Sequence, residues 1–224
     1  MYCARAMNES IDVGFGALRV APLEVGSVDA LAALLASTFD ADEGYRYLFP
    51  RADERPRGLT DFFTRNLQVH LPYRCTYVAH DAEGQLLAAV TLRPPGGIPI
   101  SLATMLRRGL LPFALAHGRA AVKRLFWLKD TYDALELSAA RGEPHWHVHM
   151  MAVRRDHQGR GVGSALLGRV IDRVGNSKHP TTLTTHLPEN VAFYRRASFV
   201  VTAEQTLQPP GERAYTVWSM RREQ

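Results

Sequence analysis

One short segment places the tightest limits on how this chain can fold. Residues 158–164 read Gln-Gly-Arg-Gly-Val-Gly-Ser, between a strand-like stretch, HWHVHMMAV, and an amphipathic one, SALLGRVIDRV. Glycines allow backbone angles that other residues avoid and let a ligand approach the main chain. Successive N–H groups at a helix start point toward an anion, and the helix dipole adds to the attraction. The segment predicts a strand–turn–helix unit that binds phosphate; the alternative is a tight turn whose glycines serve only packing.

Two widespread phosphate motifs do not fit this turn. A dinucleotide-binding fingerprint needs G-x-G-x-x-G and an acidic residue about 20 positions later. Here Gly159, Gly161 and Gly163 give G-x-G-x-G, and neither Asp nor Glu occurs between Asp172 and Glu189. A P-loop ends in Lys followed by Ser or Thr, and this turn contains no Lys.

The rest of the chain predicts an α/β (α+β) fold with a mixed central sheet and flanking helices. Strand-like stretches occupy residues 17–23, 75–79, 86–92 and 145–153, and further strands follow the glycine turn. After the breaker PPGGIP, two stretches with apolar faces (102–117 and 120–140) predict an inserted helical pair. We therefore expect a loose N-terminal arm (1–16) and one domain (17–224), with a helical insertion at about 100–140.

Charge and cysteine content narrow the partners. The 224 residues carry a formal net charge of +5, which suits nucleic acid, an anionic membrane or a small polyanion. The basic residues are dispersed, so we expect no nucleic acid and no membrane partner. No apolar run could span a bilayer, and the N-terminus lacks the apolar core of a secretory signal. Cys3 and Cys75 show no metal or disulfide spacing, which favours a cytoplasmic location.

From His147 onward the sequence resembles the Gcn5-related N-acetyltransferase (GNAT) superfamily. The superfamily signature, Q/R-x-x-G-x-G/A, is matched by residues 158–163. A second motif is matched by Asn190, by Phe193-Tyr194 and by Phe199, although Ser198 stands where the superfamily usually has Gly. The resemblance is densest to puromycin acetyltransferase-like members.

This resemblance implies a sheet splayed at its fourth strand, with acetyl-CoA as cosubstrate in the opening. The pantetheine arm would pair with the backbone of three consecutive residues, Met151, Ala152 and Val153. The pyrophosphate would lie on the turn formed by Gln158, Gly159, Arg160, Gly161, Val162, Gly163 and Ser164. Asn190 would cap a short helix or contact the pantetheine amides. Tyr194 stands where the superfamily places the proton donor to the CoA sulfur; the alternative is an ordinary core tyrosine.

Three histidines on the strand before the turn are candidates for proton transfer. His145, His147 and His149 alternate, so their side chains should share one face. An imidazole pKa near 6.5 suits a group that accepts a proton near neutrality. The spacing of His147 and His149 also resembles that of arylalkylamine acetyltransferases, which favours both as catalytic residues. Zinc binding and simple packing are the alternatives, and we expect no metal.

The sequence thus predicts an N-acetyltransferase that moves an acetyl group directly from acetyl-CoA to the amine of a small molecule. A protein lysine or N-terminal amine is the alternative acceptor, and a non-catalytic acyl-CoA sensor is the alternative class. The acceptor pocket should be formed by the first helices and the insertion, where aromatic and acidic residues gather. We expect a monomer or homodimer.

Overall fold

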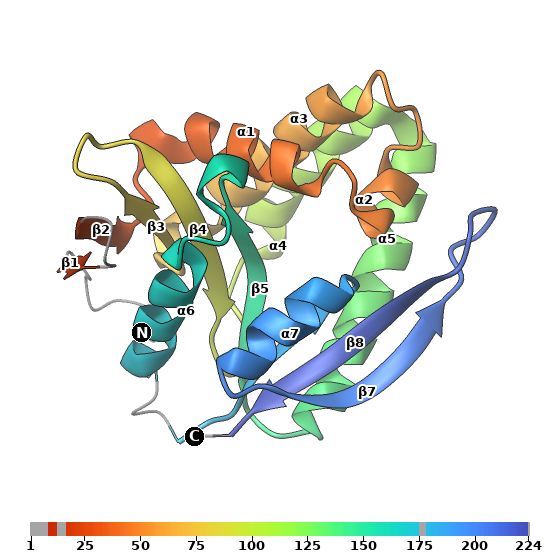
Figure 1. Cartoon of the computed structure of the whole chain (residues 1–224). Coiled ribbons are helices and arrows are strands. Elements are labelled where there is room, and N and C mark those ends of the chain that lie inside the picture. Colours follow the sequence, from red (N-terminus) through yellow and green to blue (C-terminus); the bar gives the residue numbers. More distant parts are fainter. Residues whose placement is uncertain (1–8, 13–16, 175–177, 224) are drawn as a thin grey trace.

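The computed structural model describes residues 9–12, 17–174 and 178–223 (Figure 1). Eight strands form one sheet: β1 (Glu9–Asp12), β2 (Ala17–Pro22), β3 (Thr76–His80), β4 (Leu86–Arg93), β5 (Trp146–Val153), β6 (Thr181–Thr185), β7 (Val200–Leu207) and β8 (Tyr215–Arg222). The α-helices are α1 (Val28–Phe39), α2 (Glu43–Leu48), α3 (Arg55–His70), α4 (Leu102–Thr104), α5 (Leu111–Ala140), α6 (Val162–Val174) and α7 (Pro188–Arg196). A π-helix, η3 (Met105–Leu110), joins α4 to α5. Short 3-10 turns are η1 (Val25–Ser27), η2 (Leu71–Tyr73) and η4 (Arg155–His157).

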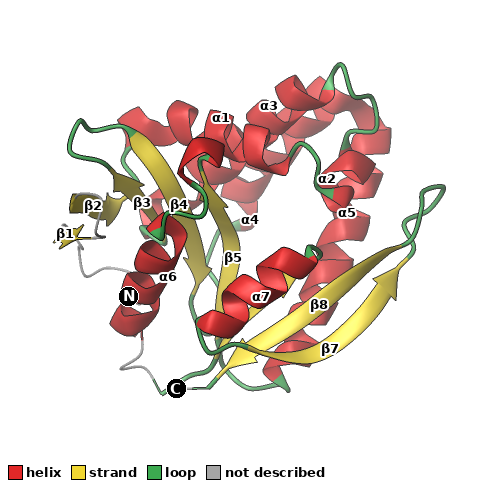
Figure 2. Cartoon of the chain, viewed as in Figure 1, coloured by secondary structure: helices red, strands yellow, loops and turns green. Residues whose placement is uncertain are grey.

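The sheet is mixed, as predicted. Its strand order is β1-β2-β3-β4-β5-β6-β8-β7. The pairing of β5 with β6 is parallel, and the other neighbouring strands pair antiparallel. Helices and strands are distributed along the whole chain (Figure 2), so the α/β assignment is confirmed.

The sheet opens between β5 and β6. These strands pair only over residues 146–148 and 181–183, ending with Val148 opposite Leu183. Beyond Val148, the backbone of β5 has no partner on that side among the described strands. In Figure 1, β5 and the β7–β8 hairpin diverge, with α7 drawn between them. Counted from β2, the first strand that the sequence predicted, β5 is the fourth strand, and the predicted splay is confirmed.

Two apolar cores lie on opposite faces of the sheet. The first core contains α6 and α7 side chains, such as Leu166 and Tyr194, packed on strand residues such as Val148. The second core contains side chains of α1, α2, α3 and α5, such as Phe63 and Leu128, packed on strand residues such as Met150. A ligand that enters the opening between β5 and β6 therefore has one helical layer on each side.

The segment predicted as an inserted helical pair is helical, with a break where the sequence placed one. Residues 111–140 form α5, but Gly118 has φ 76° and ψ 176°, which no helix contains. The helix therefore consists of two segments, before and after Gly118. Directly before α5, Met105–Leu110 form a π-helix rather than a regular α-helix.

Two expectations for the chain's first half need revision. Residues 1–16 were expected to be a loose arm, but Glu9–Asp12 pair with β2 because that edge strand offers unpaired backbone groups. Residues 1–8 and 13–16 lie outside the described residues. Cys75 is disulfide-bonded, so the cysteine argument for a reducing compartment does not hold. Among the described helices, none is both long and apolar enough to cross a membrane.

Candidate active site

The glycine turn has the backbone conformation that its sequence predicts. Gly159 and Gly161 have φ values of 74° and 85°, in the left-handed region that side chains disfavour. A Cβ atom built on either glycine would meet no atom within 4 Å. Backbone angle, rather than lack of space, therefore requires glycine at these two positions.

Gly163 is required for a different reason. A Cβ at this position would lie 3.0 Å from Cγ2 of Val153 and 3.1 Å from Cε of Met151. Both distances are well below normal van der Waals contact. The absence of a side chain thus lets the first turn of α6 lie directly against the end of β5.

The start of α6 offers hydrogen-bond donors to an anion. The carbonyl of Gly161 accepts the first intrahelical bond, from Ala165 N at 2.9 Å. The N–H groups of Val162, Gly163 and Ser164 lie in the first turn, where a helix leaves its donors without intrahelical acceptors. The Gln158 side chain donates to the Val153 carbonyl at 3.0 Å, which ties the turn to the end of β5. Donors, glycine geometry and the open edge of β5 together fit a pyrophosphate joined to an extended arm.

Tyr194 lies on the first-core side of the opening. Its hydroxyl is 3.8 Å from Sδ of Met151, one of the residues on the open part of β5. Burial raises the pKa of Tyr194 above its ordinary value of 10.0. The phenol therefore keeps its proton at neutral pH and can donate it.

The backbone conformation at the C-terminus of α7 explains why glycine would be favoured at the position of Ser198. Phe199 N donates to the Tyr194 carbonyl and Ser198 N to the Arg195 carbonyl, which is a Schellman motif. Ser198 has φ 66°, the left-handed position of this motif that favours glycine. At the other end of α7 the cap residue is Leu187, so the predicted capping role of Asn190 is wrong. Asn190 lies partly buried in the first turn, which leaves its predicted contact with pantetheine as a proposal.

A β-bulge at His149 changes which face each β5 side chain occupies. Thr91 is opposite Met150 and Leu92 is opposite Val148, so His149 has no partner on β4. Before the bulge Val148 packs in the first core, and after it Met150 packs in the second. The rings of His147 and His149 lie 6.3 Å apart, in agreement with the predicted shared face.

The ring of His147 has a hydrogen bond, at Nδ1, and a longer polar contact, at Nε2. Nδ1 is 2.9 Å from Oγ1 of Thr182, and Nε2 is 3.6 Å from a carboxylate oxygen of Glu136 on α5. The same carboxylate accepts from His145 at 3.0 Å and pairs with Arg93 of β4. Burial, with a smaller contribution from Arg93, keeps the pKa of His147 well below 6.5. This network joins the insertion to the sheet.

His149 is the strand histidine whose ring is not engaged in this network. The described residues place no hydrogen-bond partner on its ring, and its closest aromatic neighbours are His70 and His147, each 6.3 Å away. Burial, followed by the charge of Arg93 and of His70, holds the pKa of His149 well below 6.5. The ring is neutral at pH 7 and can accept a proton, but as a weak base.

A second polar cluster, which no sequence pattern indicated, lies beside the opening. Nε2 of His186, the residue after β6, is 2.7 Å from Oδ2 of Asp42, the N-cap residue of α2. The hydroxyls of Tyr132 on α5 and Tyr215 on β8 are 3.3 Å apart, and the Tyr215 ring packs edge-on against His186. Asp42 and Tyr132 belong to the first helices and the insertion, where the sequence predicted an acceptor pocket. Some aromatic residues of the same region, such as Phe63, are instead buried in the second core.

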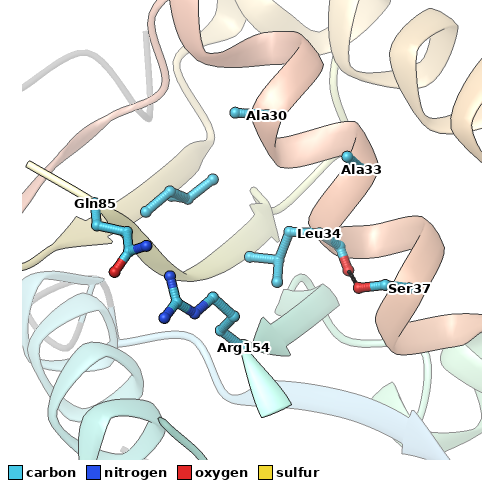
Figure 3. A pocket seen from close by; sticks show the side chains of 7 residues that line it. Ala30, Ala33, Leu34, Ser37, Gln85 and Arg154 are labelled. Carbon is cyan, nitrogen blue, oxygen red and sulfur yellow. Dashed lines mark hydrogen bonds between the residues drawn. The ribbon is translucent and has the colours of Figure 1, made fainter. Parts of the chain in front are cut away.

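One cavity lies apart from the glycine turn and the polar clusters. A cavity of about 350 Å³ between α1 and the end of β5 is lined by Ala30, Ala33, Leu34, Ser37, Gln85, Leu86 and Arg154 (Figure 3). In the described part of the chain, none of the residues expected to bind acetyl-CoA lines it. Within those same residues, no group of three or more His, Cys, Asp or Glu side chains is arranged to hold a metal ion.

Comparison with known proteins decides the family. A profile of the Acetyltransferase (GNAT) family matches residues 39–199, which include the glycine turn, β5 and Tyr194. This chain belongs to the GNAT acetyltransferase family. Membership agrees with the splayed mixed sheet and makes the chain an acyl-transfer enzyme by family.

Solved GNAT structures share its fold over nearly the whole chain. The histone acetyltransferase HPA2 and related acetyltransferase from Corynebacterium glutamicum has 21% identity and a TM-score of 0.62, covering 91% of this chain and 94% of that one. The polyamine N-acetyltransferase of Drosophila melanogaster, which forms N-acetylagmatine, has 18% identity and a TM-score of 0.60, covering 92% and 100%. The mosquito protein arylalkylamine N-acetyltransferase like 5b has 12% identity and a TM-score of 0.58, covering 92% and 100%. At these identities the likeness establishes the fold alone.

Proposed function

We propose that this GNAT protein transfers an acetyl group directly from acetyl-CoA to the amine of a small molecule, without a metal ion. The observation that carries the proposal is the glycine turn set against the open edge of β5. Val162, Gly163 and Ser164 supply donors for a pyrophosphate, and Met151 to Val153 supply an unpaired backbone for an extended arm. The absent side chain of Gly163 brings these two parts together.

Three tasks accompany acetyl transfer to an amine: proton removal from the amine, stabilisation of the oxyanion and protonation of the thiolate. Tyr194 is our proposed proton donor to the thiolate, because its protonated hydroxyl lies against Met151 on the open strand. Of the strand histidines predicted to take the amine proton, His149 is the better placed, since the ring of His147 is engaged by Thr182 and Glu136. The low basicity of His149 leaves room for a stronger base in the same site.

Support for a small-molecule acceptor comes from the face where α2 and α5 lie. Aromatic rings and the carboxylate of Asp42 gather there, which suits a cationic amine. Several proteins of the same fold are N-acetyltransferases of polyamines, agmatine or arylalkylamines, as far as their names describe them. A protein amine remains the alternative acceptor, favoured only by the likeness to a histone acetyltransferase-related fold.

Cofactor binding is tested by thermal unfolding. Acetyl-CoA should raise the melting temperature, whereas NAD and ATP should not; at 100 times its dissociation constant, the stabilisation should be about 2.7 kcal/mol. Gly161→Val should abolish the effect, because valine strongly disfavours φ 85°. If saturating acetyl-CoA leaves a folded sample unchanged, the cofactor proposal is wrong.

Catalysis is tested by CoA release with agmatine, spermidine, phenylethylamine and a lysine-containing peptide. Turnover of one or more small amines, well above the peptide, supports the proposal. Preference for the peptide would establish the alternative acceptor class, and binding of acetyl-CoA without any turnover would favour a sensor. Zinc analysis of the purified protein, expected to find no stoichiometric metal, tests the metal-free part of the proposal separately.

A further inference from the structure

The carboxylate–imidazole pair of Asp42 and His186 combines residues from distant parts of the chain in a partly enclosed position. Nε2 of His186 is 2.7 Å from Oδ2 of Asp42, and the side chains are 14% and 9% exposed. The other oxygen of Asp42 accepts from Tyr45 N at 3.0 Å, so the carboxylate is fixed by the start of α2. A carboxylate this close to Nε2 favours the tautomer with the proton on Nε2, which leaves the lone pair on Nδ1.

The lone pair of His186 remains available. Within the described chain no group hydrogen-bonds to Nδ1, and this atom is not among the buried polar atoms without a partner. Nδ1 is therefore accessible to a small molecule rather than used by the fold. A neutral His149 is also accessible, but it lacks a carboxylate that would stabilise its charged form.

The strand pairing places His186 beside the opening between β5 and β6. The last β5–β6 pair is Val148 with Leu183; His186 is three residues beyond Leu183, and Met151 is three residues beyond Val148. Both residues therefore lie beyond the paired part of the two strands, on either side of the opening. The hydroxyl of Tyr194 contacts Met151 on the β5 side.

The two groups approach the opening from opposite faces. Thr182 contacts His147 on the second-core face, whereas Leu183 packs in the first core. Alternation along β6 then places His186 on the second-core face, where it meets α2. Tyr194 belongs to the first core. An acyl group held between them would have an imidazole on one side and a phenol on the other.

We propose that the Asp42–His186 pair is the base that takes the proton from the acceptor ammonium, ahead of His149. This inference rests on the proposed acetyl transfer. One ammonium proton moves to Nδ1, where Asp42 stabilises the imidazolium, and later passes to solvent. The amine nitrogen then forms a bond to the acyl carbon, and the carbon–sulfur bond breaks. After the bond forms, the nitrogen loses its second proton to solvent. Tyr194 protonates the thiolate and takes a proton back from solvent, so these two transfers balance.

The charges around His186 favour this role. The titratable groups that face it are Asp42 and Glu43 from α2 and Tyr215 from β8, with Tyr132 of α5 bonded to Tyr215. Burial alone would lower the pKa of His186, but the hydrogen bond and charge of Asp42, aided by Glu43, outweigh burial and raise the pKa above 6.5. A raised pKa makes His186 a stronger base than His149, which suits it to an ammonium whose pKa is about 10.

The test is a pH–rate profile of His186→Gln with the amine that wild-type protein turns over fastest. Glutamine can still donate to Asp42 but cannot accept a proton. We expect kcat to fall about 10²-fold or more near pH 7, and the loss to shrink as rising pH supplies free amine. The melting shift caused by acetyl-CoA and the KM for acetyl-CoA should stay unchanged.

Asp42→Asn provides a second variant that keeps the α2 cap, because asparagine also accepts from Tyr45 N. In the wild type, kcat/KM should fall as pH drops through the His186 pKa, since the protonated ring accepts nothing. Removing the carboxylate lowers that pKa, so the acid limb should move to lower pH. His117→Gln is the matched control: His117 and Asp61 form another imidazole–carboxylate pair at 2.8 Å, between α5 and α3, and its loss should leave the profile unchanged.

The possible results separate the two proposals. If His186→Gln retains wild-type rates across pH, or if His149→Gln alone shows the pH-rescued loss, the Asp42–His186 base is refuted while acetyl transfer stands. An unmoved acid limb in Asp42→Asn also refutes it, even if His186→Gln fails to fold. If wild-type protein neither binds acetyl-CoA nor releases CoA with any amine, the proposed function fails, and the base assignment falls with it.

Discussion

Alanine substitutions at two glycines of α6 can measure how much the close approach of this helix to β5 contributes to stability. At Gly163 a Cβ would lie 3.0 and 3.1 Å from Val153 and Met151, whereas at Gly168 it would meet no atom within 4 Å. Alanine at either position gains about 0.5–1 kcal/mol from the lower backbone entropy of the unfolded chain. Only Gly163→Ala adds overpacking, which typically costs about 1–3 kcal/mol.

Because the helix-propensity gain is common to both variants, it cancels in their difference. We therefore expect Gly163→Ala to be less stable than Gly168→Ala by about 1–3 kcal/mol in urea unfolding. The displaced neighbours belong to the open part of β5, so Gly163→Ala should also weaken acetyl-CoA binding, and each 1.4 kcal/mol lost is tenfold in affinity. Equal stability and equal acetyl-CoA affinity in the two variants would show that close packing of α6 on β5 matters neither for the fold nor for the cofactor.

Three further predictions concern Tyr194, Ser198 and the strand histidines. Tyr194→Phe should lower kcat at all pH values, whereas the loss in a base variant should shrink at high pH. The loss in Tyr194→Phe should shrink when the acyl donor is a thioester of a less basic thiol. A loss that high pH rescues would contradict the donor role. Ser198→Gly should stabilise the protein by about 0.5–1 kcal/mol in urea unfolding, because φ 66° costs serine more than glycine; no gain would mean that the turn relaxes. Burial lowers the folded-state pKa of His147 and His149, so below about pH 6.5 the unfolded chain binds more protons than the folded one. The free energy of unfolding should therefore fall as pH drops below that value. A free energy of unfolding that does not change with pH in urea titrations would refute this.

Local sequence signals predicted the conformation of the turn that we propose as the cofactor site. The glycine turn depends on backbone angles that only glycine adopts easily, so residues 158–164 predict their own conformation. Ser198 is a similar case, since the left-handed end of α7 explains why relatives favour glycine there. The break between the insertion helices was also predictable, because Gly118 stands between two apolar-faced stretches.

The acceptor side could not be predicted in the same way. Asp42 and His186 lie far apart in the sequence, and their pairing depends on how α2 packs beside the end of β6. The helix α2 spans only Glu43–Leu48, too short for a periodic apolar pattern. His147 illustrates the reverse problem: its spacing suggested catalysis, but Glu136 and Thr182, which engage its ring, come from other elements.

The bulge at His149 lets one strand present side chains to both cores in an order that strict alternation would not give. Strict alternation would place Met151 and Val153 on the same face as His147. The extra residue reverses the alternation, so Met151 and Val153 instead turn toward Gly163 and the first core. The histidines before the bulge therefore face the acceptor side, while the residues after it contact α6 and Tyr194. Because of this change of face, β5 borders the histidine side of the opening before the bulge and the Tyr194 side after it.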